Sequence, residues 1–247
     1  MHPFSPLTST NLVLLFHTVP SSDWFERTLR IIGSIYKFIS IKEIESYYYE
    51  HKKFNNHCHI CFDDGDRSFY ENALPVLKKM NIPVALFVSP KVLDSEFMYW
   101  FDELTYIRNY LDNVYLKETI CEVLGCKYSQ IMGYRIESIF KSMKIAEVSQ
   151  VINTVKKKYN IDIKKRYSIT KNQLYELNDL DIITIGAHTM NHPILSNETD
   201  DYAEKEISES VVGLSKLLDE DIKYFAYPNG ATGLDYGIRE QLILQEN

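Results

Sequence analysis

The 247-residue sequence lacks the features that assign many chains to a class at once. It has four cysteines, and they show no framework of the kind that staples small secreted domains. No run of eighteen apolar residues occurs, so no transmembrane segment is predicted. The formal net charge of −7 argues against nucleic acid as a main partner, because phosphate contacts dominate that affinity.

A secretory leader is also not visible. Residues 1–11 carry no basic segment, and the apolar run 12–16 is too short for a secretory core. We expect Cys58 and Cys61 to be packing residues on a strand, and Cys121 and Cys126 to be free thiols, which fits a reducing compartment. The sequence as written therefore predicts a cytoplasmic protein, or an exported or envelope-associated one if a leader has been trimmed.

The length and the apolar content favour one domain covering 1–247. The chain is close to the ~250 residues typical of a barrel of alternating strands and helices. Hydrophobic residues make up 45%, enough to fill such a core. The segment 98–169 is mostly helical in pattern and longer than a simple crossover between strands needs. We interpret it as an insertion at the barrel rim, with Tyr99 and Trp100 as candidates to line the substrate groove.

Spacing and apolar runs predict the main elements. Helical periodicity covers 23–38, 67–80 and 200–219, and strand patterns cover 82–88, 181–186 and 222–227. Two basic runs, 156–158 and 164–166, could contact an anionic glycan or a lipid phosphate, although a solvated helix face is the simpler interpretation.

Three short polar motifs each stand where an apolar run stops. They read FDDG at 62–65, HTMNHP at 188–193 and FAYPNG at 225–230. The carboxyl ends of barrel strands are where catalytic groups collect, so we expect the three motifs to converge on one site.

The first two motifs supply the ligands of a catalytic metal ion. A catalytic zinc-type ion uses three protein ligands and keeps one position open. His188, His192 and either Asp63 or Asp64 meet that count. Because neighbouring residues at a strand end point in opposite directions, one aspartate could bind the ion while the other acts as a base.

Each motif alone is compatible with an ordinary structural role, namely an Asp-Asp-Gly turn and a core histidine. Their combination at strand ends favours a metal-dependent hydrolase. A phosphatase built on Asp63 and Asp64 is a weaker alternative, because the usual aspartate-nucleophile pattern spaces its aspartates by one residue.

These residues carry a resemblance. The FDDG motif, the H-[ST]-x-x-H-P segment and the Tyr227-Pro228 turn resemble the first three motifs of the polysaccharide deacetylases, the NodB-homology carbohydrate esterases. The resemblance implies an α/β fold, a distorted (β/α)7-type TIM-like barrel, and hydrolysis of N-acetyl groups from amino sugars. It implies that Asp63 is the general base, that Asp64, His188 and His192 bind the metal, and that the backbone N–H near Tyr227 helps hold the oxyanion.

The sequence departs from the common family pattern after the third motif. Most members continue to an L-x-x-H whose histidine is the general acid, but no histidine follows His192 here. An L-x-x-H occurs instead at 14–17, after the apolar run 12–16. This order resembles the circularly permuted branch that deacetylates poly-N-acetylglucosamine, and it implies that His17 is the acid. The alternative for His17 is a histidine that caps an N-terminal strand.

The prediction is a metal-dependent N-deacetylase with a divalent ion, most often zinc in such sites, and an N-acetylated saccharide of a cell-surface polysaccharide or its precursor as substrate. The alternative is a catalytically inactive glycan-binding relic of the fold, suggested by the short C-terminal part. The sequence makes no prediction of the oligomeric state.

Overall fold

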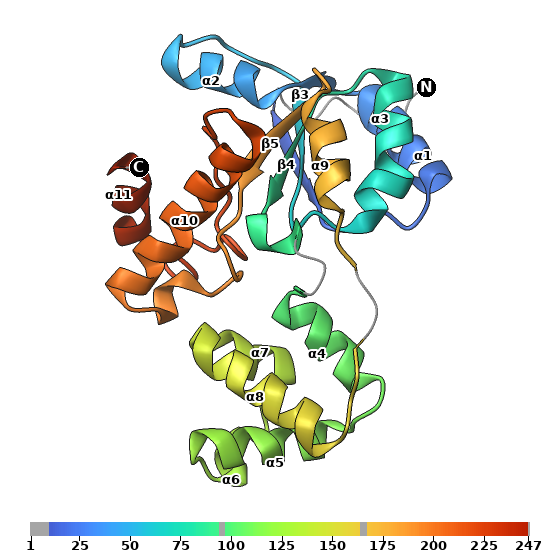
Figure 1. The fold of residues 1–247 in the computed structure, drawn as a ribbon. Helices are drawn as coiled ribbons and strands as arrows, with labels where there is room; N and C mark the ends of the chain where they lie inside the picture. Colours follow the sequence, from blue (N-terminus) through green and yellow to red (C-terminus); the bar gives the residue numbers. More distant parts are fainter. Residues whose placement is uncertain (1–9, 94–96, 164–166, 247) are drawn as a thin grey trace.

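A computed structural model of the protein describes residues 10–93, 97–163 and 167–246 (Figure 1). Its strands are β1 Leu12–Phe16, β2 Lys37–Ile39, β3 His57–Phe62, β4 Val84–Val88 and β5 Ile183–Ala187. Around them lie α1 Ser22–Gly33, α2 Ile41–Tyr49, η1 Phe69–Ala73, α3 Leu74–Met80, η2 Pro90–Leu93, α9 Lys171–Asn178, η3 Leu195–Asn197, α10 Asp200–Leu218 and α11 Ile238–Glu246. Between η2 and α9 come α4 Trp100–Arg108, α5 Asn113–Leu124, α6 Tyr128–Ile131, α7 Ile136–Lys141 and α8 Ile145–Lys158.

The described strands form one five-stranded, wholly parallel sheet. Its main path runs β1-β3-β4-β5, and β2 pairs with the first residues of β3. All five residues of β4 are buried, as expected of a strand in a parallel sheet covered on both faces. The fold is thus α/β, and the strand ends that precede His17, Asp63 and His188 point the same way. In the described residues the pairing does not close into a barrel, so the seven-stranded barrel stays a prediction.

The predicted helix over 23–38 is wrong only in its last five residues, 34–38. Helix α1 begins at the Ser21 cap, whose side chain accepts from the Trp24 N–H, and ends at Gly33. Lys37 then pairs with His57 to start β2. The backbone partners that β3 offers outweigh a helical spacing of apolar residues, which is a common way for tertiary contacts to override periodicity.

The helix predicted over 67–80 is confirmed, because these residues are helical throughout. It contains a π-helical turn, η1, before α3, and Pro75, which has no N–H to donate into the preceding turn, lies in the first turn of α3. One other element prediction needs correction. The strand predicted over 222–227 is reduced to one parallel bridge between Ala187 and Phe225, and Pro228 cannot extend that pairing.

The helices α4 to α8 form a group apart from the sheet, which we call the helical segment (Figure 1). It has its own apolar core, in which Ile107, Leu116, Ile120 and Val151 are fully buried. Lys156 and Lys158 of the first basic run pair with Glu103 and Glu122 across the helices, and the second run, 164–166, lies outside the described residues. The single-domain assignment, with 98–169 as an insertion, stays a prediction.

All four cysteines lie in the described part of the chain and are free thiols. Burial raises the pKa of Cys58 to about 11 and, with the charge of Asp63 added, that of Cys61 to about 12, so both are unreactive packing residues. None of the described helices has the length and apolarity that a membrane span requires.

Candidate metal centre and catalytic cleft

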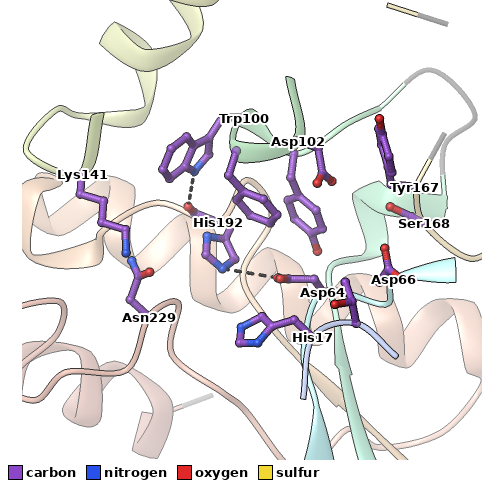
Figure 2. A pocket seen from close by; sticks show the side chains of 13 residues that line it. His17, Asp64, Asp66, Trp100, Asp102, Lys141, Tyr167, Ser168, His192 and Asn229 are labelled. Atoms are coloured by element: carbon purple, nitrogen blue, oxygen red, sulfur yellow. Dashed lines mark hydrogen bonds and ion pairs between the residues drawn. The ribbon is translucent and has the colours of Figure 1, made fainter. Parts of the chain in front are cut away.

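A pocket opens beside the carboxyl ends of the strands, between the sheet and the helical segment (Figure 2). Its lining comes from both regions: His17, Thr18, Asp64, Asp66, Tyr99, Trp100, Phe101, Asp102, Lys141, Tyr167, Ser168, His192 and Asn229. The first two polar motifs therefore meet at one place, as expected from parallel strands whose ends share an edge.

The two aspartates lie just beyond β3. Asp63 donates its backbone N–H to the Phe16 carbonyl at 3.1 Å, which continues the pairing with β1. Asp64 then adopts a left-handed backbone, with φ of 68°, and Gly65 follows with φ of 62°. This turn separates the two carboxylates, so our expectation that simple strand alternation does so was incomplete. Asp63 is 8% exposed and Asp64 is 7% exposed.

The two histidines of the second motif flank the Asp64 carboxylate. His188 Nε2 lies 3.5 Å from Asp64 Oδ1, and His192 Nε2 lies 3.4 Å from the same oxygen. His188 Nδ1 is 2.8 Å from the Ala226 carbonyl, which can only accept, so Nδ1 carries the proton and Nε2 presents a lone pair. This is the arrangement by which a second contact fixes the tautomer of a metal-ligating histidine.

The donor set fits a divalent ion. One ligand atom from each of Asp64, His188 and His192 lies within 4.8 Å of the others. Among the described residues, Asp64 Oδ1 and His188 Nε2 are buried without a hydrogen-bond partner. Buried polar atoms without partners are costly, and a cation would satisfy both. Two imidazoles and one carboxylate make a common catalytic zinc set, although the same ligands also hold other divalent ions.

Burial and neighbouring charges separate the pKa values of the two aspartates. Burial raises the pKa of Asp63, with the charge of His188 opposing and that of Asp64 adding to the effect. Burial acts the same way on Asp64, but its contacts with His188 and His192 outweigh it and lower the pKa. Asp64 thus stays ionised as a ligand should, whereas Asp63 is tuned toward accepting a proton.

His17 lines the same pocket as Asp64 and His192, at the carboxyl end of β1 (Figure 2). It is near enough for a positive charge there to lower the pKa values of both Asp63 and Asp64. Tyr227 does not line the pocket: its ring stacks on Tyr236, with ring centroids 3.8 Å apart, and Asn229 reaches the pocket from the same loop. Any contribution of Tyr227 to the reaction therefore rests on its backbone, and that role stays a prediction.

The start of α4 supplies an aromatic wall. Tyr99 and Phe101 place their ring centroids 5.6 and 4.9 Å from that of His192, and Trp100 Nε1 donates to the His192 carbonyl at 3.0 Å. Tyr99 and Trp100 thus line the pocket, as the sequence suggested. Phe101 and Asp102, their neighbours, were not singled out, although a Tyr-Trp-Phe-Asp run that opens a helical segment is itself a signal.

Comparison with known families identifies this arrangement. The family model described as polysaccharide deacetylase matches residues 51–241. The chain belongs to the polysaccharide deacetylase family. The match includes Asp63, Asp64, His188, His192 and Tyr227 but leaves His17 outside. A comparison of the sequence with curated proteins found no match.

Solved structures agree on the fold of this deacetylase. IcaB from Ammonifex degensii is 18% identical with a TM-score of 0.60, covering 96% of this chain and 80% of its own. Streptococcus pyogenes deacetylase PplD, solved with acetate, is 17% identical with a TM-score of 0.57, covering 98% and 81%. The deacetylase domain of BpsB from Bordetella bronchiseptica is 14% identical with a TM-score of 0.57, covering 96% and 85%. Family membership supports deacetylation of a polysaccharide as the activity.

Proposed function

We propose that this deacetylase is a metal-dependent hydrolase that removes N-acetyl groups from amino sugars of a cell-surface polysaccharide or its precursor. The observation that carries the proposal is the buried group of Asp64, His188 and His192, in which Asp64 Oδ1 and His188 Nε2 lack hydrogen-bond partners, at the wall of a pocket that His17 also lines. The family match supports the reaction class. The donor set of two histidines and one aspartate supports zinc as the ion. The position of His17 at the pocket, directly after β1, supports a permuted barrel as the fold.

In this proposal Asp64, His188 and His192 would hold a divalent ion, which would supply the positive charge that polarises the acetyl carbonyl. Asp63 takes a proton from the attacking water, and the raised pKa of its buried carboxyl suits that task. The C–N bond breaks as His17 gives a proton to the nitrogen. Acetate and a free amino sugar leave. The Tyr227 backbone N–H helps to hold the negative charge that develops on the carbonyl oxygen.

The aromatic wall gives the cleft its substrate preference in this proposal. The rings of Tyr99 and Phe101, stacked at a centroid distance of 5.0 Å, present apolar surface beside the proposed ligand His192. The apolar face of a sugar ring and an acetyl methyl group are both suited to such a surface. Asp66 and Asp102 in the same lining offer acceptors for sugar hydroxyls.

The test is acetate release from N-acetylglucosamine oligomers by protein that has been stripped of metal and then reloaded with zinc, cobalt or nickel. We expect about one bound ion per chain and turnover that depends on it. Asp64→Ala should lose both. Binding of the oligomers without any acetate release, with metal bound, would instead favour the inactive glycan-binding alternative.

A second experiment tests His17 as the proposed general acid. His17→Ala should keep metal and stability but lose about 10²–10⁴-fold in rate on the amide, the usual contribution of a positioned acid. It should lose less on an activated ester, because that leaving group needs no proton. Equal losses on both substrates would remove His17 from the proposed mechanism.

A further inference from the structure

The turn between the two histidines of the second motif has an unfavourable backbone. Thr189 and His192 both have left-handed φ values, 58° and 55°. That conformation costs a residue with a side chain roughly 1–2 kcal/mol. Neither residue is glycine, so contacts from outside the turn must hold it in this shape.

The main contact comes from a buried carboxylate on α10. Glu206, 3% exposed, accepts the backbone N–H groups of Met190 at 3.0 Å and Asn191 at 2.8 Å through Oε2. Its other oxygen, Oε1, accepts from the side-chain amide of Asn191. Both carboxylate oxygens are thus used on the two residues that stand between Thr189 and His192. Hydrogen bonds to an ionised group are about twice as strong as neutral ones.

Three further contacts hold the turn, but none of them provides an acceptor in place of Glu206. Lys91 Nζ donates to Asn191 Oδ1 at 2.6 Å, which orients the amide that faces Glu206. Ser89 Oγ donates to the Met190 carbonyl at 2.8 Å, and the Thr189 hydroxyl accepts the His192 N–H at 3.1 Å. The N–H groups of Met190 and Asn191 therefore depend on Glu206, and without it two part-buried donors lose their acceptor.

We propose that Glu206 is a positioning residue of the metal centre, which fixes the Met190–Asn191 turn so that His188 and His192 both face Asp64. The inference rests on the proposed function, because it assigns that geometry to metal binding. Glu206 touches neither the ion nor the substrate. It acts by removing the freedom of the turn that carries one proposed ligand at each end.

The decisive measurement is zinc affinity by chelator competition, together with the thermal midpoint of the metal-free protein. Glu206→Gln is nearly isosteric but puts an amide N–H₂ against the N–H donors. We expect it to weaken zinc binding about 10–100-fold, the usual effect of losing a residue that orients a metal ligand. Glu209→Gln is the matched control: the residue lies on the same helix but is exposed, 3.8 Å from Lys205, and its loss should leave affinity unchanged.

A second substitution distinguishes positioning from general stability. When Glu206→Gln is combined with Asn191→Asp, the carbonyl of the new amide can accept both backbone N–H groups. Its N–H₂ can donate to the new carboxylate, which Lys91 then neutralises. We expect this pair to regain at least half of the lost affinity on a logarithmic scale. If Glu206→Gln does not fold, Asn191→Ala, which removes only the side-chain bond, should still weaken zinc binding several-fold.

The outcomes separate the two hypotheses. Wild-type protein that binds none of the tested ions would overturn the proposed function, and this inference with it. Wild-type protein that binds zinc while Glu206→Gln and Asn191→Ala bind it equally well would overturn this inference alone, even if their thermal midpoints fall.

Discussion

The sheet with its covering helices and the helical segment bury different chemistry. The sheet region buries charged and polar groups, with Asp63, Asp64, His188, His192 and Glu206 all less than 9% exposed. The helical segment is built around an apolar core, and three ion pairs link its helices, Arg108–Glu137, Lys156–Glu103 and Lys158–Glu122; its buried Lys117 donates to the Met132 carbonyl. Buried charges need fixed partners, whereas an apolar core needs only volume and pattern. The difference places the proposed reaction chemistry in the sheet region, whereas the helical segment contributes one wall of the cleft.

The two regions meet at the cleft. Trp100, Phe101, Asp102 and Lys141 of the helical segment line it, together with Tyr99 just before α4, and the proposed metal ligands all come from the sheet region. The comparison can be tested by asking whether a change in one region affects the property assigned to the other.

The largest expected effect is in the sheet region. Asp63→Asn should keep fold and zinc but lose a hundredfold or more in acetate release, because the proposed base is gone while the proposed ligand set remains. Asp64→Asn should lose zinc and activity together. Metal analysis beside initial rates checks both. If Asp63→Asn loses its ion and Asp64→Asn keeps it, the two roles are exchanged.

Alanine substitutions in the two cores should lower the free energy of unfolding by similar amounts, and the one in the helical segment should leave zinc affinity almost unchanged. Leu116 and Leu77 are both fully buried, the first in the helical segment and the second under the sheet. Each change to alanine should cost about 2–5 kcal/mol in urea unfolding. We expect Leu116→Ala to leave zinc affinity within about twofold of wild type. A tenfold loss in that variant would show that the regions do not act separately.

The smallest expected effect is a pH dependence of stability that comes from Asp102, which lines the cleft between the two regions. Burial, with the charges of Asp64 and Asp66 adding, raises the pKa of Asp102 from 3.8 to about 7. The folded state then holds a proton that the unfolded chain loses, so this group makes stability fall as pH rises from about 4 to about 7, with little further change above.

Urea unfolding of metal-free protein between pH 5 and 8 measures this slope, which cannot exceed about 1.4 kcal/mol per pH unit for one proton. Asp102→Asn should be less sensitive to pH than wild type, since the other titrating groups are common to both. Added zinc should reduce the wild-type slope, because a cation near Asp64 favours the charged form of Asp102. An unchanged slope in Asp102→Asn would exclude this group.

The sequence predicted the parts that depend on local pattern. The strands β4 and β5 were placed within two residues, since a continuous apolar run that ends in turn or motif residues is typical of a buried strand. The sheet topology and the short strand β2 were not, because Lys37–Ile39 is extended only through its pairing with β3. Residues 222–227 likewise form one bridge rather than a strand, because the chain stays beside β5 only at Phe225.

For the candidate site too, the sequence predicted what depends on local pattern and not what depends on the fold. The sequence grouped Asp63, Asp64, His188 and His192 into one candidate site because their motifs are contiguous and specific. Glu206 was missed, although a signal was present: it stands on the side of α10 that carries the buried residues Ala203 and Ile207. An acid on the apolar side of an amphipathic helix requires a buried partner. What the sequence could not show is which partner the fold brings to it.

The indole of Trp100 gives the protein an optical reporter of its own chemistry. Its N–H donates to the His192 carbonyl, and the side chain is 8% exposed. The sequence holds one other tryptophan, Trp24, which is 39% exposed on α1. In a Trp24→Phe background the emission comes from the indole that contacts the proposed metal loop. Loading of the centre can then be followed by fluorescence in real time, without a substrate and without a label.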